Sequence, residues 1–158
     1  MIPHLLPAYR STVWFLPHSV RGNVAILGAW NPGSQRRTTS ANLAMDLRLQ
    51  GQIASGAVRV IGASADGLWF EEMWIVPYDR HHVLRLLLRF GQHSALIRQG
   101  GRWRLLWRNG ICQPGGGRRA TLSVAVRTMF RSTMKKTLTE PSSQSPSKIR
   151  KANLPLDG

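Results

Sequence analysis

Acidic residues and cysteines are both scarce in this chain of 158 residues. Seven Asp and Glu stand against 22 Lys and Arg. The single cysteine, Cys112, excludes an intramolecular disulfide and a metal site built from cysteines. Few carboxylates also argue against a site with two metal ions. We therefore expect no metal and no cofactor.

Long apolar runs are missing as well. No stretch approaches the roughly 18 consecutive apolar residues that a membrane-spanning helix needs. The first residues include Pro3 and Pro7 and lack the apolar segment of a signal peptide. We therefore expect a cytoplasmic protein that does not associate with membranes.

Positive charge is the strongest feature of the composition, with a formal net charge of +15. A compact chain with this charge repels itself, so a polyanionic partner such as nucleic acid is one explanation. The alternative is an arginine-rich composition without functional meaning. The charge is densest after residue 112, where nine basic residues face two acidic ones, against thirteen and five before it.

The composition changes near residue 113, which predicts a domain over residues 8–112 and a tail over 113–158. Strand-like segments occupy residues 12–15, 23–30, 58–63, 69–76, 95–98 and 102–107. Helical patterns cover residues 41–53, after a cap at Ser40, and the segment between Asp79 and Gly91. This ββαββαββ order predicts an α+β domain with a mainly antiparallel sheet. The tail is predicted to be basic and partly disordered, with an amphipathic helix over residues 121–138.

The most informative segment is the loop over residues 31–42, which leaves an apolar strand and enters a helix. Backbone N–H groups and the helix dipole at such a place favour an anion. Ser34, Arg36 and Arg37 would add donors. The loop is not a P-loop, because the Gly-Lys-Ser/Thr ending is absent. The alternative interpretation is an ordinary turn followed by an ordinary helix cap.

Several short motifs lie in and around this loop. They are Tyr9 before a strand, Ala-Trp-Asn-Pro-Gly-Ser at 29–34, Ser-Ala-Asn at 40–42, an acidic residue at 71 or 72 before an apolar strand, and Phe-Gly-Gln at 90–92. With these motifs the chain resembles an uncharacterised bacterial family, domain of unknown function 3293. The resemblance covers roughly residues 8 to 108 and leaves the tail out. It supports the domain boundaries and implies no activity.

Polar residues of this pattern stand at the ends of predicted elements, where binding sites are commonly built. Amides and a carboxylate could bind a base edge or a ribose, and an arginine could bind phosphate. The candidate ligand-binding residues are Asn31, Ser34, Arg36, Arg37, Asn42, Glu71, Glu72 and Gln92. The same set could position water for hydrolysis, with Glu71 or Glu72 as general base. In the alternative interpretation the amides cap helices and bridge turns.

A second group of candidates is basic. Along residues 102–107, Arg102 and Arg104 face one side of the predicted strand, while Trp103 and Trp107 face the other. We expect the tryptophans in the core and the arginines on a surface that contacts phosphates. The predicted nucleic-acid-binding residues are Arg102, Arg104, Arg118, Arg119, Arg127, Arg131, Lys135 and Lys136.

The sequence thus predicts a binding protein for nucleic acid or another phosphate-bearing ligand. One alternative is a small enzyme or nucleotide binder that uses the loop over residues 31–42 with Glu71 or Glu72. Another is an inhibitor or assembly factor that docks on an acidic protein.

Overall fold

The computed structural model describes residues 6–115, 117–121, 123, 126, 128–130 and 132. Its helices are α1 (Leu6–Ser11), the short 3-10 helix η2 (Pro32–Ser34), α2 (Thr39–Gln50) and α3 (Arg80–Arg89). Its strands are β1 (Val13–Leu16), β2 (Val24–Leu27), β3 (Val58–Ala63), β4 (Phe70–Pro77), β5 (Ser94–Gln99), β6 (Arg102–Trp107), β7 (Cys112–Pro114) and β8 (Arg118–Thr121). The predicted α+β class is confirmed, and the expected ββαββαββ order lies within this longer series.

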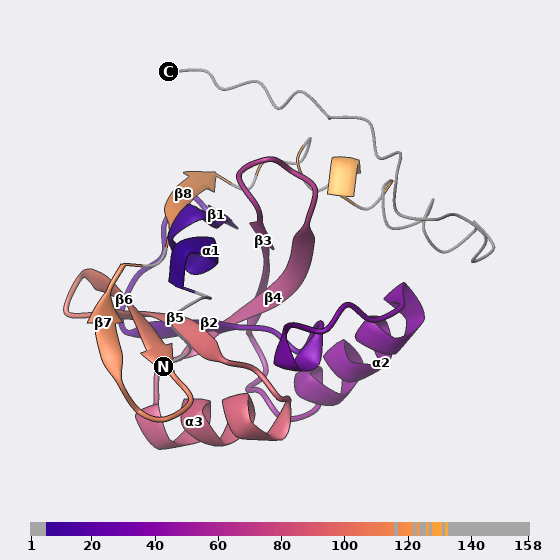
Figure 1. The fold of residues 1–158 in the computed structure, drawn as a ribbon. Helices are drawn as coiled ribbons and strands as arrows, with labels where there is room; N and C mark the ends of the chain where they lie inside the picture. The colour runs from indigo at the N-terminus through magenta and orange to yellow at the C-terminus, as the bar shows by residue number, and fades with distance from the viewer. Residues whose placement is uncertain are drawn as a thin grey trace.

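All eight strands form one curled sheet in the order β7-β6-β5-β2-β4-β3-β1-β8 (Figure 1). Neighbouring strands are antiparallel except for β1 and β8, which run parallel. The curl brings the two ends of the sheet together, since the guanidinium of Arg119 on β8 lies 5.7 Å from the ring centre of Trp103 on β6.

Apolar side chains cover both faces of the sheet. On the outer face, α2 and α3 pack against a cluster that includes Leu27, Trp74 and Leu106. On the inner face, α1 lies within the curl (Figure 1), and its Tyr9 meets Trp107 edge to face at 5.5 Å. Central strands are therefore apolar in consecutive residues, because both of their faces are buried.

The predicted helix ends are partly right. Asp79 caps α3, since its carboxylate accepts a hydrogen bond from the backbone N–H of His82 at 2.6 Å. The cap of α2 is Thr38, which accepts from Ala41 N, so the prediction of Ser40 is wrong. Thr38 has the extended backbone that an N-cap needs, whereas Ser40 already lies inside the helix.

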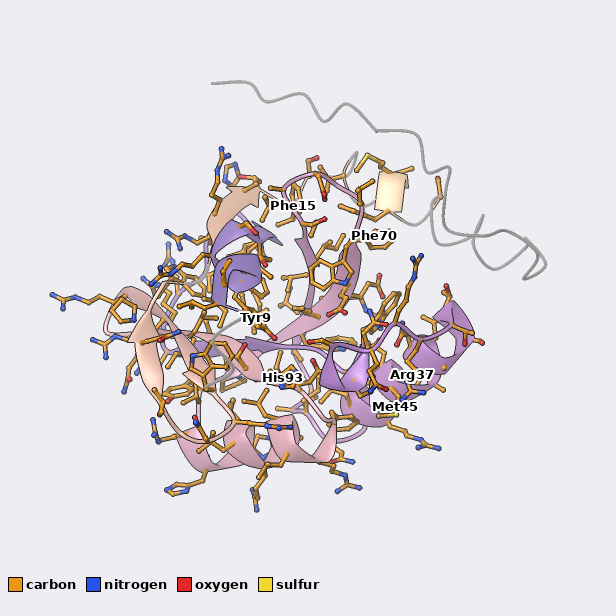
Figure 2. All side chains as sticks on the ribbon, in the orientation of Figure 1. Tyr9, Phe15, Arg37, Met45, Phe70 and His93 are labelled. Atoms are coloured by element: carbon orange, nitrogen blue, oxygen red, sulfur yellow. The ribbon has the colours of Figure 1, made fainter. Side chains whose placement is uncertain are left out.

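The sheet continues past residue 112, because β7 pairs with β6 and β8 pairs with β1. Farther along, Phe130 is buried against Phe15 and Phe70, with ring centres 5.7 and 4.8 Å away. Figure 2 shows Phe15 and Phe70 at this end of the sheet. Most of the helix predicted over residues 121–138 falls outside the described residues. No helix in the described part is long and apolar enough to cross a membrane.

Candidate ligand-binding site

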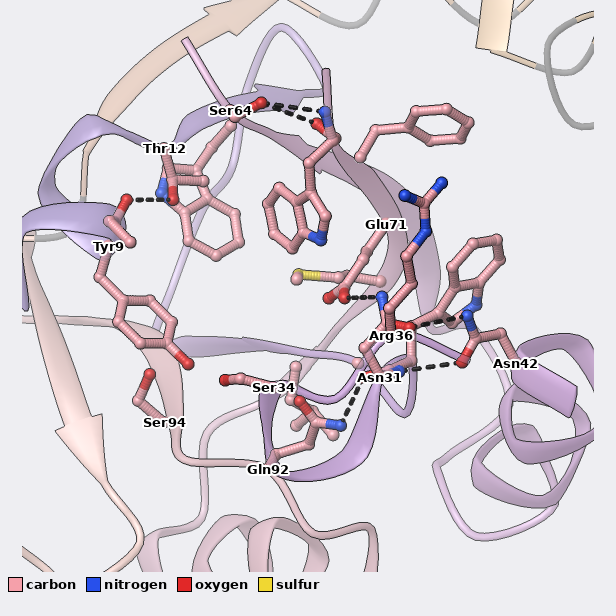
Figure 3. Close-up of a pocket in the computed structure, with 18 of the residues that line it drawn as sticks. Tyr9, Thr12, Asn31, Ser34, Arg36, Asn42, Ser64, Glu71, Gln92 and Ser94 are labelled. Carbon is pink, nitrogen blue, oxygen red and sulfur yellow. Dashed lines mark hydrogen bonds between the residues drawn. The ribbon is translucent and has the colours of Figure 1, made fainter. Parts of the chain in front are cut away.

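A pocket of about 590 Å³ lies inside the curl of the sheet (Figure 3). The inner face of β2 and β4 forms one side, and α1, the loop after β2 and the turn between β3 and β4 surround it. The structure brings together there most of the predicted ligand-binding residues, namely Asn31, Ser34, Arg36, Arg37, Asn42, Glu71 and Gln92. Glu72 is the exception.

Large apolar side chains form much of the pocket wall. They are Trp14, Ile26, Trp30, Trp69, Phe70 and Met73. A volume of this size accommodates a ligand of several rings, and apolar walls with a few polar groups are typical of small-molecule sites. The aromatic rings favour a flat ligand, which can stack on them.

The loop that carries the polar residues has an unusual backbone. Asn31 adopts the left-handed conformation with φ 48°, which asparagine tolerates better than most residues. Gly33 donates its N–H to the carbonyl of Gly91 at 2.8 Å. A Cβ at Gly91 would lie 3.1 Å from the Cβ of Pro32, and φ there is +63°. Glycine at position 91 therefore allows the loop to approach the end of α3.

The side chain of Asn31 is the centre of a hydrogen-bond network. Its Nδ2 donates to Glu71 Oε1 at 2.7 Å. Its Oδ1 accepts from the backbone N–H of Arg37 at 2.9 Å and from Asn42 Nδ2 at 3.1 Å. The Asn31 backbone N–H donates to Asn42 Oδ1 at 2.9 Å. The network joins the loop to α2 and β4, so the bridging role considered for these amides is present, and it also orients a carboxyl group in the pocket.

Glu71 lies on β4 with only 5% of its surface exposed. Burial raises the pKa of its carboxyl group to about 7, although hydrogen bonds from Asn31 and Trp69 partly oppose the rise. Among the described residues, no lysine, arginine or histidine forms an ion pair with it. A buried carboxyl group that gains or loses its proton near neutral pH is typical of binding and catalytic sites.

Glu72 faces the opposite side of the sheet, because side chains alternate along a strand. Its carboxylate pairs with Arg59, which also contacts Asp46 of α2 at 3.1 Å. The Arg59 guanidinium lies 4.4 Å from the ring centre of Trp74, whose indole N–H donates to Asp46 at 2.8 Å. These groups attach α2 to the sheet, and the structure places Glu72 in this cluster and not in the pocket.

The remaining predicted residues have different surroundings. Gln92 Nε2 donates to the carbonyl oxygen of Trp30 at 2.8 Å, so it holds the segment between α3 and β5 against the chain that follows β2. Arg36 and Arg37 are exposed, and within the described chain neither pairs with a carboxylate. Ser34 is exposed at the same loop. Two positive charges without a carboxylate partner in the described chain therefore lie at the edge of the pocket, while its interior holds the carboxyl group of Glu71.

Sequence reasoning missed the part of the pocket contributed by α1. The hydroxyl groups of Tyr9 and Ser94 face each other there (Figure 3). Burial raises the pKa of Tyr9, the Ser94 hydroxyl opposes the rise, and the charge of Glu71 adds to it. The only signal for this region was the place of Tyr9 in the family resemblance, since α1 has no long amphipathic pattern.

The predicted nucleic-acid-binding residues do not share one surface. Arg102 and Arg104 are exposed and alternate with Trp103 and Trp107, as expected, and Trp107 is buried on the inner face. Arg119 lies over Trp103 and so belongs to the inner side. Arg118 is exposed on β8. The other predicted residues, Arg127, Arg131, Lys135 and Lys136, lie outside the described residues.

No group of three or more His, Cys, Asp or Glu side chains that could hold a metal ion occurs among the residues that the structure describes. Cys112 is a free thiol, half-buried on β7. The polar side-chain groups of the described pocket are amides, hydroxyls, indole N–H groups, arginines and one carboxyl group.

Fold and site together define a small α+β protein with a single curled sheet that encloses a ligand-sized pocket. Residues 27–95 match the model of the family described as "Protein of unknown function (DUF3293)". This match confirms the resemblance predicted from the sequence, and it includes the loop, α2, Glu71 and Gln92. No curated protein and no solved structure matches the chain.

Proposed function

We propose that this protein binds a flat small molecule with a phosphate or another anionic group, such as a nucleotide, in the pocket around Glu71. The flat part lies among the aromatic side chains, and the anionic group lies beside Arg36 and Arg37. The observation that carries this proposal is the meeting, in one pocket, of polar residues from the loop after β2, from α2, from β4 and from the segment between α3 and β5.

The partners of the acidic side chains support the proposal. Five acidic residues precede position 113, and four of them have a structural role. Asp46 and Glu72 bind Arg59. Asp66 accepts hydrogen bonds within the β3–β4 turn, and Asp79 caps α3. Only Glu71 is buried without a cation. Such burial costs free energy, so a group of this kind is retained where a ligand can interact with it.

Nucleotide binding can be measured through the tryptophans of the pocket. The protein is titrated with 5′-monophosphates of adenosine, guanosine, cytidine and uridine, and with the matching nucleosides. We expect at least one nucleotide to change the intrinsic fluorescence and to raise the melting temperature. Replacing Arg36 and Arg37 by Ala should weaken nucleotide binding about tenfold or more and leave nucleoside binding nearly unchanged, because a hydrogen bond to a charged group is worth about 1.5–3 kcal/mol.

Arg48→Ala is the matched control, since Arg48 is also an exposed arginine but lies on α2 outside the pocket. Equal losses in the control and in the double variant would mean that general charge, and not the pocket, governs binding. Absence of any response to flat anionic ligands at millimolar concentration would refute the proposal.

Nucleic-acid binding is a second candidate, supported by a different observation. Arg102 and Arg104 project on the face of the sheet that α3 covers. The exposed basic residues of α3, namely Arg80, His81, Arg85 and Arg89, lie on the same side, and the helix contains no acidic residue. A group of exposed basic side chains on one side suits contact with a phosphate backbone.

Salt titrations test this second candidate. For duplex DNA, each phosphate contact contributes about 0.9 to the slope of log K against log salt. Replacing Arg102 and Arg104 by Ala should therefore lower the slope by up to about 2, and Arg48→Ala should leave it unchanged. A slope unaffected by the double change would exclude these arginines from the contact. The cytoplasmic location and an acidic protein partner stay predictions.

A further inference from the structure

The open hydrogen-bonding capacity of Glu71 indicates what its ligand must offer. An ionised carboxylate only accepts hydrogen bonds and has about four lone-pair positions on its two oxygens. In the described chain, two side chains give Glu71 hydrogen bonds, Asn31 at 2.7 Å and Trp69. A carboxylate that is 5% exposed and has two donors is left with about half of its acceptor capacity unused. A ligand edge with N–H donors would supply what the protein lacks.

The network also fixes which oxygen of Glu71 is open. The backbone N–H groups of Arg37 and Asn31 can only donate, so they fix Asn31 Oδ1 and Asn42 Oδ1 as acceptors. The amide nitrogen of Asn31 must therefore point to Glu71 Oε1. Oε1 is an acceptor in both protonation states, and a proton on the carboxyl group must reside on Oε2. Oε2 is the atom whose character changes with pH.

The surroundings of Glu71 favour a flat ring as the group that carries the donors. Trp14, Trp30, Trp69 and Phe70 line the same pocket, and aromatic faces attract flat rings and the positive edges of N–H groups. Arg36 and Arg37 at the edge of the pocket repel a simple cation and suit an anionic substituent. The ligand thus combines a flat ring rich in N–H donors at one end with an anionic group at the other.

We propose that Glu71 recognises a 2-amino-4-oxopyrimidine ring, the donor edge shared by guanine nucleotides and pterins. This ring presents a ring N–H beside an amino group, so two neighbouring donors meet the carboxylate, with Oε2 accepting from one of them. The inference rests on the proposed ligand-binding function of the pocket. It adds the chemical class of the ring and the residue that selects it.

Calorimetric titration of the full chain with matched ligands tests the inference. Guanosine monophosphate and 6-carboxypterin represent the two sources of the ring. Inosine monophosphate lacks only the 2-amino group, and adenosine monophosphate lacks both donors of this edge. We expect guanosine monophosphate, 6-carboxypterin or both to bind at least tenfold more tightly than the other two, because a site built for a donor rejects an analogue without it.

Two further measurements identify Glu71 as the selecting group. In the wild type, affinity for the preferred ligand should be constant above about pH 7 and fall about tenfold per pH unit below it, because the proton on Oε2 competes with the ligand. In Glu71→Gln, the preference over inosine monophosphate and this pH dependence should both disappear. Circular dichroism and melting temperature confirm that the variant is folded.

The outcomes separate this inference from the proposed function. If adenosine and guanosine monophosphates bind equally and the binding requires Arg36 and Arg37, the pocket function stands and the ring assignment is wrong. The assignment is also wrong if Glu71→Gln keeps the full preference. If none of the four ligands binds at millimolar concentration, both proposals fail. Tighter binding of 6-carboxypterin than of guanosine monophosphate would assign the ring to a pterin.

Discussion

Replacing Glu71 by Gln should stabilise the protein at neutral pH, and the gain should depend on pH. Burial raises the pKa of Glu71 from its ordinary value of 4.5 to about 7. A raised carboxyl pKa means that the folded chain holds the proton more tightly than the unfolded chain. Stability from this group is therefore complete below pH 4.5 and is lost as the pH rises to about 7.

The loss corresponds to about 3 kcal/mol, because each pKa unit is worth about 1.4 kcal/mol. Gln has the same shape as a protonated Glu, and its carbonyl oxygen can accept the hydrogen bond from Asn31. The variant avoids burial of a charge, so its free energy of unfolding should exceed that of the wild type by up to about 3 kcal/mol above pH 7. The difference should nearly vanish close to pH 4.5.

Urea unfolding of both proteins at a series of pH values measures this difference in free energy of unfolding directly. The other titratable groups are the same in both proteins, so their contributions cancel in the difference. Glu72→Gln serves as the control. Glu72 binds Arg59 on the other face of the sheet, so this change removes an ion-pair partner and should not stabilise the protein. A difference between Glu71→Gln and the wild type that stays constant from pH 5 to pH 8 would refute the argument that Glu71 is buried without a counter-charge.

Three further changes test the packing that positions the pocket. Asp46→Asn should destabilise the protein by about 1.5–3 kcal/mol in urea unfolding, because it weakens a charged hydrogen bond to Arg59, which keeps Glu72 as its other partner. Gly117→Ala should lower the melting temperature by several degrees, since the new Cβ would overlap the carbonyl oxygen of Thr12 and φ there is +77°. Phe130→Ala should cost about 3 kcal/mol if the aromatic cluster holds this segment on the sheet, and an unchanged urea midpoint would show that it does not.

The loop over residues 31–42 was recognisable because its chemistry is local. Pro32 and Gly33 interrupt the apolar pattern, and hydroxyl-bearing residues precede a helix, so a turn and a helix start follow from short-range rules. The sequence pattern predicts the cap at Ser40, two residues after the observed cap Thr38, because several neighbouring hydroxyl groups can each serve as a cap. The sequence alone does not define a helix end to the residue, because the cap depends on backbone angles that the sequence pattern does not contain.

The choice between Glu71 and Glu72 could not be made from the sequence. Residues from Glu71 to Val76 are all buried, so the strand shows no alternation of polar and apolar residues that would reveal its inner face. A shift of one residue exchanges the two faces. Pairing of Gly62 with Glu71 and of Ile61 with Glu72 sets the register, and these contacts join residues that are not neighbours in sequence.

The sequence itself determined three features of the protein: its basic charge, its turn and helix signals, and its α+β class. These features depend on composition and on periodicity within short windows. The structure decided which polar residues meet. Asn31, Asn42, Glu71 and Gln92 gather because the sheet curls and its strands pair at fixed registers, which short windows do not contain. The basic charge first suggested a surface for polyanions, whereas the tertiary structure directs attention to a pocket with two arginines at its edge and one carboxyl group inside.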